Sequence, residues 1–567
     1  MNRRNFLKGS LSTAAGSVLY RTDCASAALR APGAYTVVWD LATAYRERTP
    51  TRERVCINGL WRWQPAAANA AAVPSGGWGY FRVPDSWPGD GQTHDRFSGP
   101  QLYFPSPSWK DEDVGDVTAA WYQREITIPS EWHGHRVALY AEYLNSYAAV
   151  YVEGAKAGEL RYPWGELDLS TMCHPGEKYL LSMLVKALPL HALMLSYNNT
   201  NSPERAAGKV ARRGLCGDVY LVGAPAGPRI TDVKVETSVR KWQITFNTAL
   251  AALDPEARYI LRARINDGTR QVAEFSSPAF TPHEISNGRI PLTENWRPEK
   301  LWDTHTPENQ YQASVSLLDG SGNLLDTALP ARFGFREFWI EGRDFYLNGT
   351  RIHLQAVPLN NGQGGTTMAS YEATRATLQR FKSFGVNFVY THNYSCVPGS
   401  HRSFSEVLKA ADDEGVLMAF TQPHFADYNW TAPDADQTNG YAHDAEFYVH
   451  VAENHPAVVC YSTSHNACGY SEDMNPDKLD GLWRPHKAWS LRNAERALRA
   501  QAIIQGLDST RIVYHHAGGN LGAMDTINFY VNWVPGQEMS DWFGYWATVA
   551  EKPVFTCEYS VPFPWDW

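Results

Sequence analysis

The residue best suited to chemistry is a carboxylate that ends an apolar run near the end of the chain. The segment 552–559 reads KPVFTCEY, so a short hydrophobic strand delivers Glu558 at its far end. Two more carboxylates, Glu472 and Asp473, follow a second apolar run at 458–464. Carboxylates at strand ends can serve as nucleophiles or proton-transfer groups, or they can pair with a basic neighbour or cap a turn.

The adjacent residues His515 and His516 raise the question of a metal site. Successive residues of a strand point to opposite faces, so the two rings cannot bind one ion together, and packing is the simpler interpretation. The glycine-rich segment 362–365 (GQGG) is not a phosphate loop set between a strand and a helix, and we interpret it as a loop. The sequence therefore predicts no required metal and no cofactor.

These candidates lie in a region, 337–567, where predicted strands alternate with predicted helices. Residues Ser403 and Glu406 have the spacing of a capping box, and the helix that follows should stop at Gly415. Such alternation predicts a parallel α/β sheet. The candidate strands are 352–357, 386–391, 416–421, 458–464, 512–516, 527–531 and 554–559.

A longer helix is expected before the fifth strand. Leu491, Ala494, Leu498 and Ala502 are spaced to share one face of it, and Gly506 is the expected end. Seven strands are one fewer than a closed (β/α)8 barrel needs. We therefore expect 337–567 to be a TIM barrel lacking its last strand and helix, in a fragment of a longer protein.

The first half of the chain is predicted to be all-β. Residues 34–225 contain short alternating strands broken by Gly, Pro and Asn, which favours a jelly-roll β-sandwich. Residues 226–336 have strands and hairpin turns typical of an immunoglobulin-like β-sandwich, including Asn266-Asp267-Gly268.

The N-terminal segment, 1–33, is predicted to be an export signal. It carries a twin-arginine motif, RRNFLK at 3–8, a weakly apolar run and small residues at 25–27. No later run approaches the roughly 18 apolar residues of a membrane span, so we expect a periplasmic or secreted protein. A formal net charge of -9 gives no basic footprint for nucleic acid. The 21 Trp and 29 Tyr suit stacking on sugar faces, although for most of them packing in β-sandwich cores is the simpler interpretation.

Several segments together resemble glycoside hydrolase family 2, which holds β-galactosidases, β-glucuronidases and β-mannosidases. Their joint order along the chain makes the resemblance specific. The segments are INGLW at 57–61, RGLCGDV at 213–219, EKLWD at 299–303, FGFR at 333–336 and FYLNG at 345–349.

The resemblance implies a retaining mechanism with one carboxylate after strand 4 and one after strand 7. The carboxylate after strand 7 would be the nucleophile, and Glu558 matches it. The segment HPAVVCYS at 455–462 is similar to the family's strand 4, but it continues through His465 and Asn466 to Ala467. Asn466 matches the Asn that contacts the sugar 2-hydroxyl, whereas Ala467 stands where the family has its acid/base Glu and cannot transfer a proton.

Three explanations of Ala467 remain open. The acid could have moved to Glu472 or Asp473, since their loop directly follows strand 4 and could fold back over the mouth of the barrel. His465 could serve as the acid because its pKa lies near neutrality. The third explanation is a protein that binds sugar without hydrolysing it.

Position after the predicted strands adds further substrate-binding candidates. Tyr530 is the nearest match to a family Tyr that lies beside the nucleophile. The sequence thus predicts a retaining glycosidase that cleaves terminal β-linked sugars, or alternatively a catalytically impaired carbohydrate-binding homologue, and a homo-oligomer is compatible with either. The substrate-binding candidates are His392, Asn393, His424, His465, Asn466, Tyr530 and Trp533.

Overall fold

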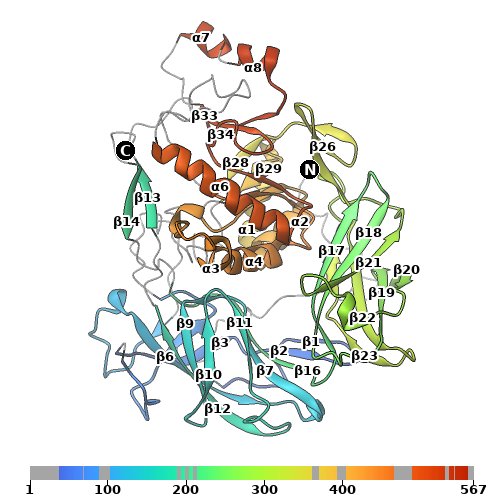
Figure 1. Ribbon diagram of the computed structural model, residues 1–567. Helices are drawn as coiled ribbons and strands as arrows, with labels where there is room; N and C mark the ends of the chain where they lie inside the picture. The colour runs from blue at the N-terminus through green and yellow to red at the C-terminus, as the bar shows by residue number, and fades with distance from the viewer. Residues whose placement is uncertain are drawn as a thin grey trace, which may run out of the picture.

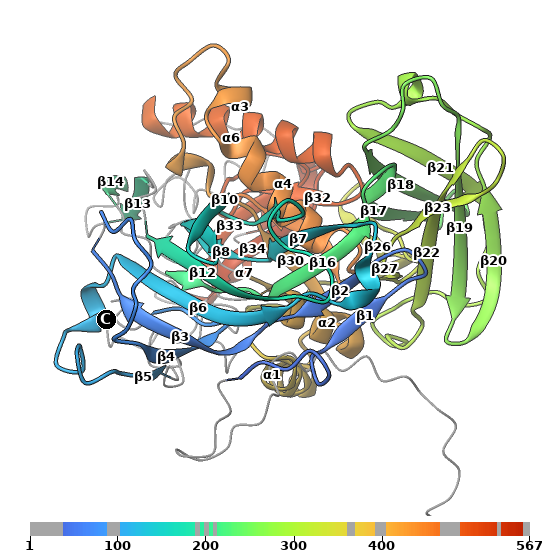
Figure 2. The same cartoon turned by 90° about the horizontal axis from the view of Figure 1, so that it is seen from below.

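The computed structural model describes residues 38–67, 69–87, 103–187, 193–197, 203–207, 213–359, 369–391, 404–464, 488–529, 535–541 and 543–559. Two β-sheet parts and one α/β part each have a hydrophobic core of their own. Figure 1 shows the first β part (blue to cyan) below the α/β part and the second (green to yellow) beside it. Figure 2 views the same arrangement from below.

The first β part consists of two antiparallel sheets whose facing residues share one core. Trp61, Trp63, Trp87 and Trp132 are fully buried there, so these aromatic rings pack the sandwich as expected. One sheet contains β1 (Arg46–Arg48), β2 (Glu53–Cys56), β16 (Val219–Pro225), β7 (His135–Ala141) and β11 (Gly165–Asp168). The other contains β10 (Ala155–Arg161), β9 (Tyr147–Val152), β12 (Lys178–Lys186), β6 (Ala119–Thr127), β3 (Gly59–Pro65), β4 (Gly79–Val83) and β5 (Tyr103–Phe104). Two short pairs join β8 (Leu144–Asn145) to β15 (Gly214–Leu215) and β13 (Leu193–Tyr197) to β14 (Pro203–Ala207).

The second β part also has two antiparallel sheets around a single core. The predicted turn at 266–268 joins β19 to β20, with Gly268 at a φ of 59°. Its first sheet contains β17 (Arg229–Ser238), β18 (Gln243–Ala251) and β21 (Arg289–Asn295). Its second contains β20 (Arg270–Ser276), β19 (Tyr259–Asp267), β22 (Tyr311–Asp319), β23 (Leu324–Thr327) and β24 (Ala331–Phe333).

The α/β part begins with a small antiparallel sheet and continues with parallel strands, each close to a predicted position. The small sheet is β25 (Phe338–Glu341), β26 (Asp344–Leu347) and β27 (Thr350–Ile352). Five parallel strands form one sheet: β28 (Ala356–Pro358), β29 (Phe388–Tyr390), β30 (Leu417–Thr421), β31 (Val458–Ser462) and β32 (Ile512–Tyr514). A parallel pair follows: β33 (Asp525–Phe529) and β34 (Val554–Tyr559). Phe555 of β34 contacts the rings of Phe388 and Tyr514, which brings β34 against β29 and β32.

Helices separate these strands. Helix α2 begins at Ser405 and Gly415 ends it as predicted, whereas Ser403 of the expected capping box lies outside the described residues. Among the described residues, no helix is long and apolar enough to span a membrane. The helices of this part are α1 (Tyr371–Ser383), α2 (Ser405–Glu414), α3 (Ala435–Thr438), α4 (Tyr441–Ala452), α6 (Ala488–Leu507), α7 (Gly536–Asp541) and α8 (Gly544–Val549).

The buried face of helix α6 differs from the prediction. Leu491 and Leu498 are 46% and 45% exposed, and of the four residues predicted to face inward only Ala494 is buried. The helix ends at Leu507, one residue after the predicted Gly506. The buried face consists of small and polar residues that allow a close approach, namely Ser490, Asn493, Ala494, Ala497, Ala500 and Ile504.

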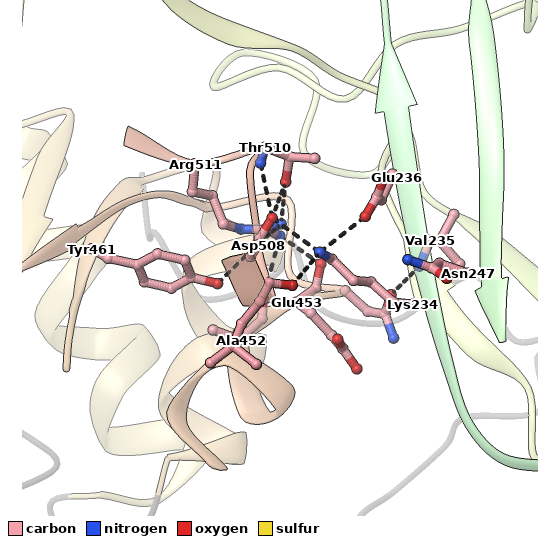
Figure 3. A network of polar contacts seen from close by, with 12 residues as sticks. Lys234, Val235, Glu236, Asn247, Ala452, Glu453, Tyr461, Asp508, Thr510 and Arg511 are labelled. Atoms are coloured by element: carbon pink, nitrogen blue, oxygen red, sulfur yellow. Dashed lines mark hydrogen bonds and ion pairs between the residues drawn. The ribbon is translucent and has the colours of Figure 1, made fainter. Parts of the chain in front are cut away.

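Buried charges join the second β part to the α/β part. Lys234 of β17, 3% exposed, places its Nζ 3.1 Å from Asp508, a fully buried residue between α6 and β32. Asp508 also accepts from Tyr461 and pairs with Arg511, as Figure 3 shows. Asp508 and Arg511 precede β32, so this junction lies at the N-terminal ends of the parallel strands.

Candidate active site

The candidate nucleophile, Glu558, is the penultimate residue of β34. Phe555 and Cys557 are buried by the alternation of the strand, while the Glu558 side chain stays 18% exposed. The register between β33 and β34 shifts near this residue: Thr556 pairs with Ile527, but the next residue of β33, Asn528, pairs with Glu558. A bulge of this kind re-aims the side chains that follow it. Glu558 therefore has the burial and the strand-end position expected for a reactive carboxylate of a barrel.

His516 contacts that carboxylate. It lies two residues after β32, is 2% exposed, and its Nε2 is 2.9 Å from Oε1 of Glu558. When Glu558 is ionised it can only accept, so the hydrogen of this bond then lies on Nε2, in the neutral Nε2–H tautomer or in the imidazolium. The prediction that His516 serves only packing is therefore wrong: the ring orients Glu558.

A tight turn after β32 aims His516 toward β34. Ala517 has a left-handed φ of 50°, an unfavourable conformation for a residue with a side chain, and its N–H points to Sγ of Cys557 at 3.5 Å. Thr526 Oγ1 accepts from Gly518 N at 2.9 Å and donates to the His515 carbonyl at 2.6 Å. These contacts with β33 and β34 hold the turn in place.

His515 faces away from Glu558, as the strand alternation predicted. Its Nδ1 is 2.5 Å from Thr463 Oγ1 and its Nε2 is 2.9 Å from Gln501 Oε1. Complete burial lowers the pKa of His515 to about 3, so its imidazole is neutral. Because Thr463 directly follows β31, His515 ties the end of strand 4 to the end of strand 5.

Tyr390 supports the nucleophile strand from the other side. Its hydroxyl donates to the Cys557 carbonyl at 3.0 Å, and its ring lies 6.3 Å from that of His516. The residue before Glu558 is thus held by a side chain from β29. Sequence analysis did not single out Tyr390, because an aromatic residue inside an apolar strand carries no local sign of this long-range bond.

His424 is the one predicted binding residue besides Glu558 that lies within the described ranges. It follows β30, is 2% exposed, and its Nδ1 accepts from Ala426 N at 3.3 Å at the start of a short 3-10 helix (Phe425–Asp427). Contact between His424 and substrate stays a prediction. The other predicted residues lie outside the described residues: His392, Asn393, His465, Asn466, Ala467, Glu472, Asp473, Tyr530 and Trp533.

Within the described ranges, one group of side chains has the spacing of a metal site, and it lies between the domains. Ligand atoms of Asp232, His450 and Glu453 all lie within 4.8 Å of one another. Arg289 already pairs with Asp232, and the His450 Nδ1 is 3.2 Å from both carboxylates. Burial raises the pKa of Glu453 to about 7, and a cluster of ion pairs and hydrogen bonds around Asp232 and His450 accounts for the group.

This domain has the alternating parallel strands and helices of an α/β barrel. Its histidine-bound carboxylate lies at the C-terminal end of one strand, which is where active sites of such barrels lie. Residues 335–563 match the family model described as "Glycosyl hydrolases family 2, TIM barrel domain". This part of the chain is therefore similar to the barrel domain of glycosyl hydrolase family 2, the family that the sequence motifs resemble.

Relatives and solved structures agree with this family. The chain is 24% identical over 391 residues to a putative beta-glucuronidase of Formosa agariphila, covering 66% of this chain and 44% of the relative. It is 23% identical over 464 residues to a beta-glucuronidase of Paenibacillus borealis, covering 76% and 70%. The Formosa relative is thus more than twice as long as the matched part.

Two solved structures have the same fold. A beta-glucuronidase of Bacteroides uniformis superposes with a TM-score of 0.63 at 17% identity, covering 89% of this chain and 58% of that one. A beta-glucuronidase of Ruminococcus gnavus in complex with D-glucuronic acid gives 0.63 at 18% identity, covering 90% and 84%.

Proposed function

We propose that the chain carries the catalytic barrel of a retaining glycosidase that removes terminal β-linked sugars, with Glu558 as the nucleophile. The observation that carries the proposal is the Glu558 carboxylate at the C-terminal end of β34, held at 2.9 Å by His516. Similarity to this family supports the same reaction class. Two proposals on architecture accompany it: a jelly-roll sandwich for 34–225 and an immunoglobulin-like sandwich for 226–336.

The reaction would run in two displacements. Glu558 attacks the anomeric carbon while the bond to the aglycone oxygen breaks, and a general acid protonates that oxygen. Water then attacks the same carbon, the bond to Glu558 breaks, and the former acid takes the proton from water. We propose Asp473 or Glu472 for this acid/base role, because Ala467 stands at the family's usual position.

A β-glucuronide is the first substrate to test. Five relatives carry the name beta-glucuronidase, one of them as putative, and two carry the name beta-galactosidase. Because five relatives carry the first name and two the second, we propose a terminal β-D-glucuronide as the preferred substrate and a β-D-galactoside as the alternative.

A second candidate function is sugar binding without turnover. The observation in its favour is Ala467, since loss of a general acid typically costs about 10²- to 10⁴-fold in rate. Activated aryl glycosides separate the two candidates, because their leaving groups need little help from an acid.

The decisive variant is Glu558→Ala, assayed on 2,4-dinitrophenyl β-D-glucuronide and β-D-galactoside. A retaining nucleophile predicts loss of turnover and, with added azide, formation of the α-glycosyl azide from single inversion. Glu414→Ala is the matched control: this buried carboxylate at the end of α2 pairs with Arg375, and its loss should leave turnover unchanged. Undiminished turnover by Glu558→Ala would refute the assignment, and no turnover by the wild type would favour the binding function.

We also propose export through the twin-arginine route to the periplasm or the exterior, on the motif at 3–8. Replacing Arg3 and Arg4 by Lys should retain the protein in the cytoplasm, and fractionation of expressing cells checks this.

A further inference from the structure

The His516–Glu558 pair has a geometry that goes beyond the proposed reaction. His516 is buried, its Nε2–H donates to Oε1 of Glu558, and its turn is fixed by Thr526 and by Cys557. Tyr390 holds the backbone beside Glu558 from a third strand. A ring held from several sides donates at one fixed position, so this bond is a preorganised part of the site.

We propose that His516 is a positioning residue that favours release of the sugar from Glu558 over its attachment, an inference that rests on the proposed function. The reason is the charge on Glu558. A hydrogen bond from an N–H is stronger to an ionised carboxylate than to an uncharged ester. The bond from His516 therefore helps whichever step restores the negative charge.

The two steps differ in this respect. In the first, an oxygen of Glu558 forms a bond to the anomeric carbon, the aglycone leaves with the bonding electron pair, and Glu558 becomes a neutral ester. In the second, water oxygen bonds to the anomeric carbon, and the electron pair of the ester C–O bond returns to Glu558. His516 stabilises the carboxylate that departs, so hydrolysis of the glycosyl-enzyme should be fast relative to its formation.

Two substitutions separate the hydrogen bond from the shape of the ring. His516→Phe keeps a ring of similar size without a donor, whereas His516→Gln keeps an amide N–H near the position of Nε2 but cannot ionise. The probe is 2,4-dinitrophenyl β-D-glucuronide, followed in rapid-mixing experiments with the full chain. The burst of dinitrophenolate reports formation of the glycosyl-enzyme and the steady rate reports its hydrolysis.

The proposal predicts that His516→Phe gives a burst near one equivalent followed by a steady rate about 10- to 100-fold below that of the wild type. His516→Gln should restore most of the steady rate and reduce the burst. Equal slowing of both steps in His516→Phe, or no restoration by His516→Gln at matched thermal stability, would overturn it.

His515→Gln is the matched control in the same turn. His515 bonds to Thr463 and Gln501 and faces away from Glu558, so its substitution should lower the unfolding temperature without changing the ratio of burst to steady rate. Failure of the proposed function has a different signature. If the wild type gave no dinitrophenolate release and no covalent adduct, the glycosidase itself would be refuted, and this inference with it.

Discussion

Substitution of Asp508 by Asn tests how the second β part is fixed to the barrel. The Asp508 carboxylate is fully buried and accepts from Tyr461, from Thr510 and from Arg511 within 2.9 Å, with Lys234 at 3.1 Å. Burial by itself would raise the pKa of Asp508, but Arg511 and Lys234 outweigh it and hold that pKa well below its usual range. The carboxylate is therefore ionised at neutral pH, and its contribution to stability is lost only as the pH falls through the acidic range.

The expected cost follows from which charges remain buried after each substitution. Asp508→Asn removes the anion and leaves Lys234 and Arg511 buried without it, which costs about 3–5 kcal/mol in comparable cases. Lys234→Met removes one cation while Arg511 still neutralises Asp508, so we expect a smaller loss of about 1–2 kcal/mol. The double variant should cost less than the sum of the two, because Lys234 and Asp508 contact each other.

Urea unfolding followed by tryptophan fluorescence measures these losses, and the double-mutant cycle gives the coupling between the two residues. Thr245→Ala is a suitable control, since its hydroxyl hydrogen-bonds to Thr293, an exposed neighbour on β21. Equal losses for Asp508→Asn and Lys234→Met, or fully additive losses in the double variant, would refute the reasoning from uncompensated charge.

Two further predictions concern proton transfer and pH. Asp473→Asn and Glu472→Gln should identify the general acid. Substitution of the true acid should lower turnover of an unactivated β-glycoside by about 10²- to 10⁴-fold and spare the first step on a dinitrophenyl glycoside. If neither variant shows this difference in steady-state assays, the displaced-acid proposal fails. Burial by itself would lower the pKa of His450, but the charges of Asp232 and Glu453 outweigh burial and raise that pKa well above its usual range. The stabilisation by His450 is therefore complete below about pH 6.5 and is lost as the pH rises through the folded-state pKa. His450→Asn should therefore flatten the fall of unfolding temperature between pH 6 and pH 9, and an unchanged slope would contradict the assignment.

The parallel strands were predictable because their signal is local. Segments such as 458–462 and 554–559 are short apolar runs bounded by polar or breaker residues, and both form strands at those positions. The turn after β9 was predictable for a similar reason, since Glu153 and Gly154 both adopt positive φ, as a two-residue hairpin turn requires.

Helix α6 shows where periodicity fails. Leu491 and Leu498 both face outward although they are large and apolar, and the buried face includes the small residues Ser490, Ala497 and Ala500. Close packing against neighbouring elements selects small side chains, and a hydrophobicity pattern gives them little weight. Tertiary packing overrides the local pattern here.

The site was predictable only as separate strand ends. Alternation along a strand indicated that His515 and His516 diverge, but it could not show that His516 meets Glu558, 42 residues away. The bond from Tyr390 to Cys557 spans 167 residues, and the contact of Lys234 with the Leu507 carbonyl spans 273. Such pairings depend on the tertiary arrangement of the chain and have no local signature.

The most direct test of the central claim is a search for a covalent glycosyl-enzyme on Glu558. The full chain would be incubated with 2-deoxy-2-fluoro-β-glycosides that carry activated leaving groups, with the glucuronide first and the galactoside second, and analysed by intact mass and peptide mapping. The account predicts one added 2-fluoroglycosyl group per chain, on the peptide containing Glu558 and absent from Glu558→Ala. An adduct on a different carboxylate, or no adduct from any glycoside that the wild type hydrolyses, would contradict it.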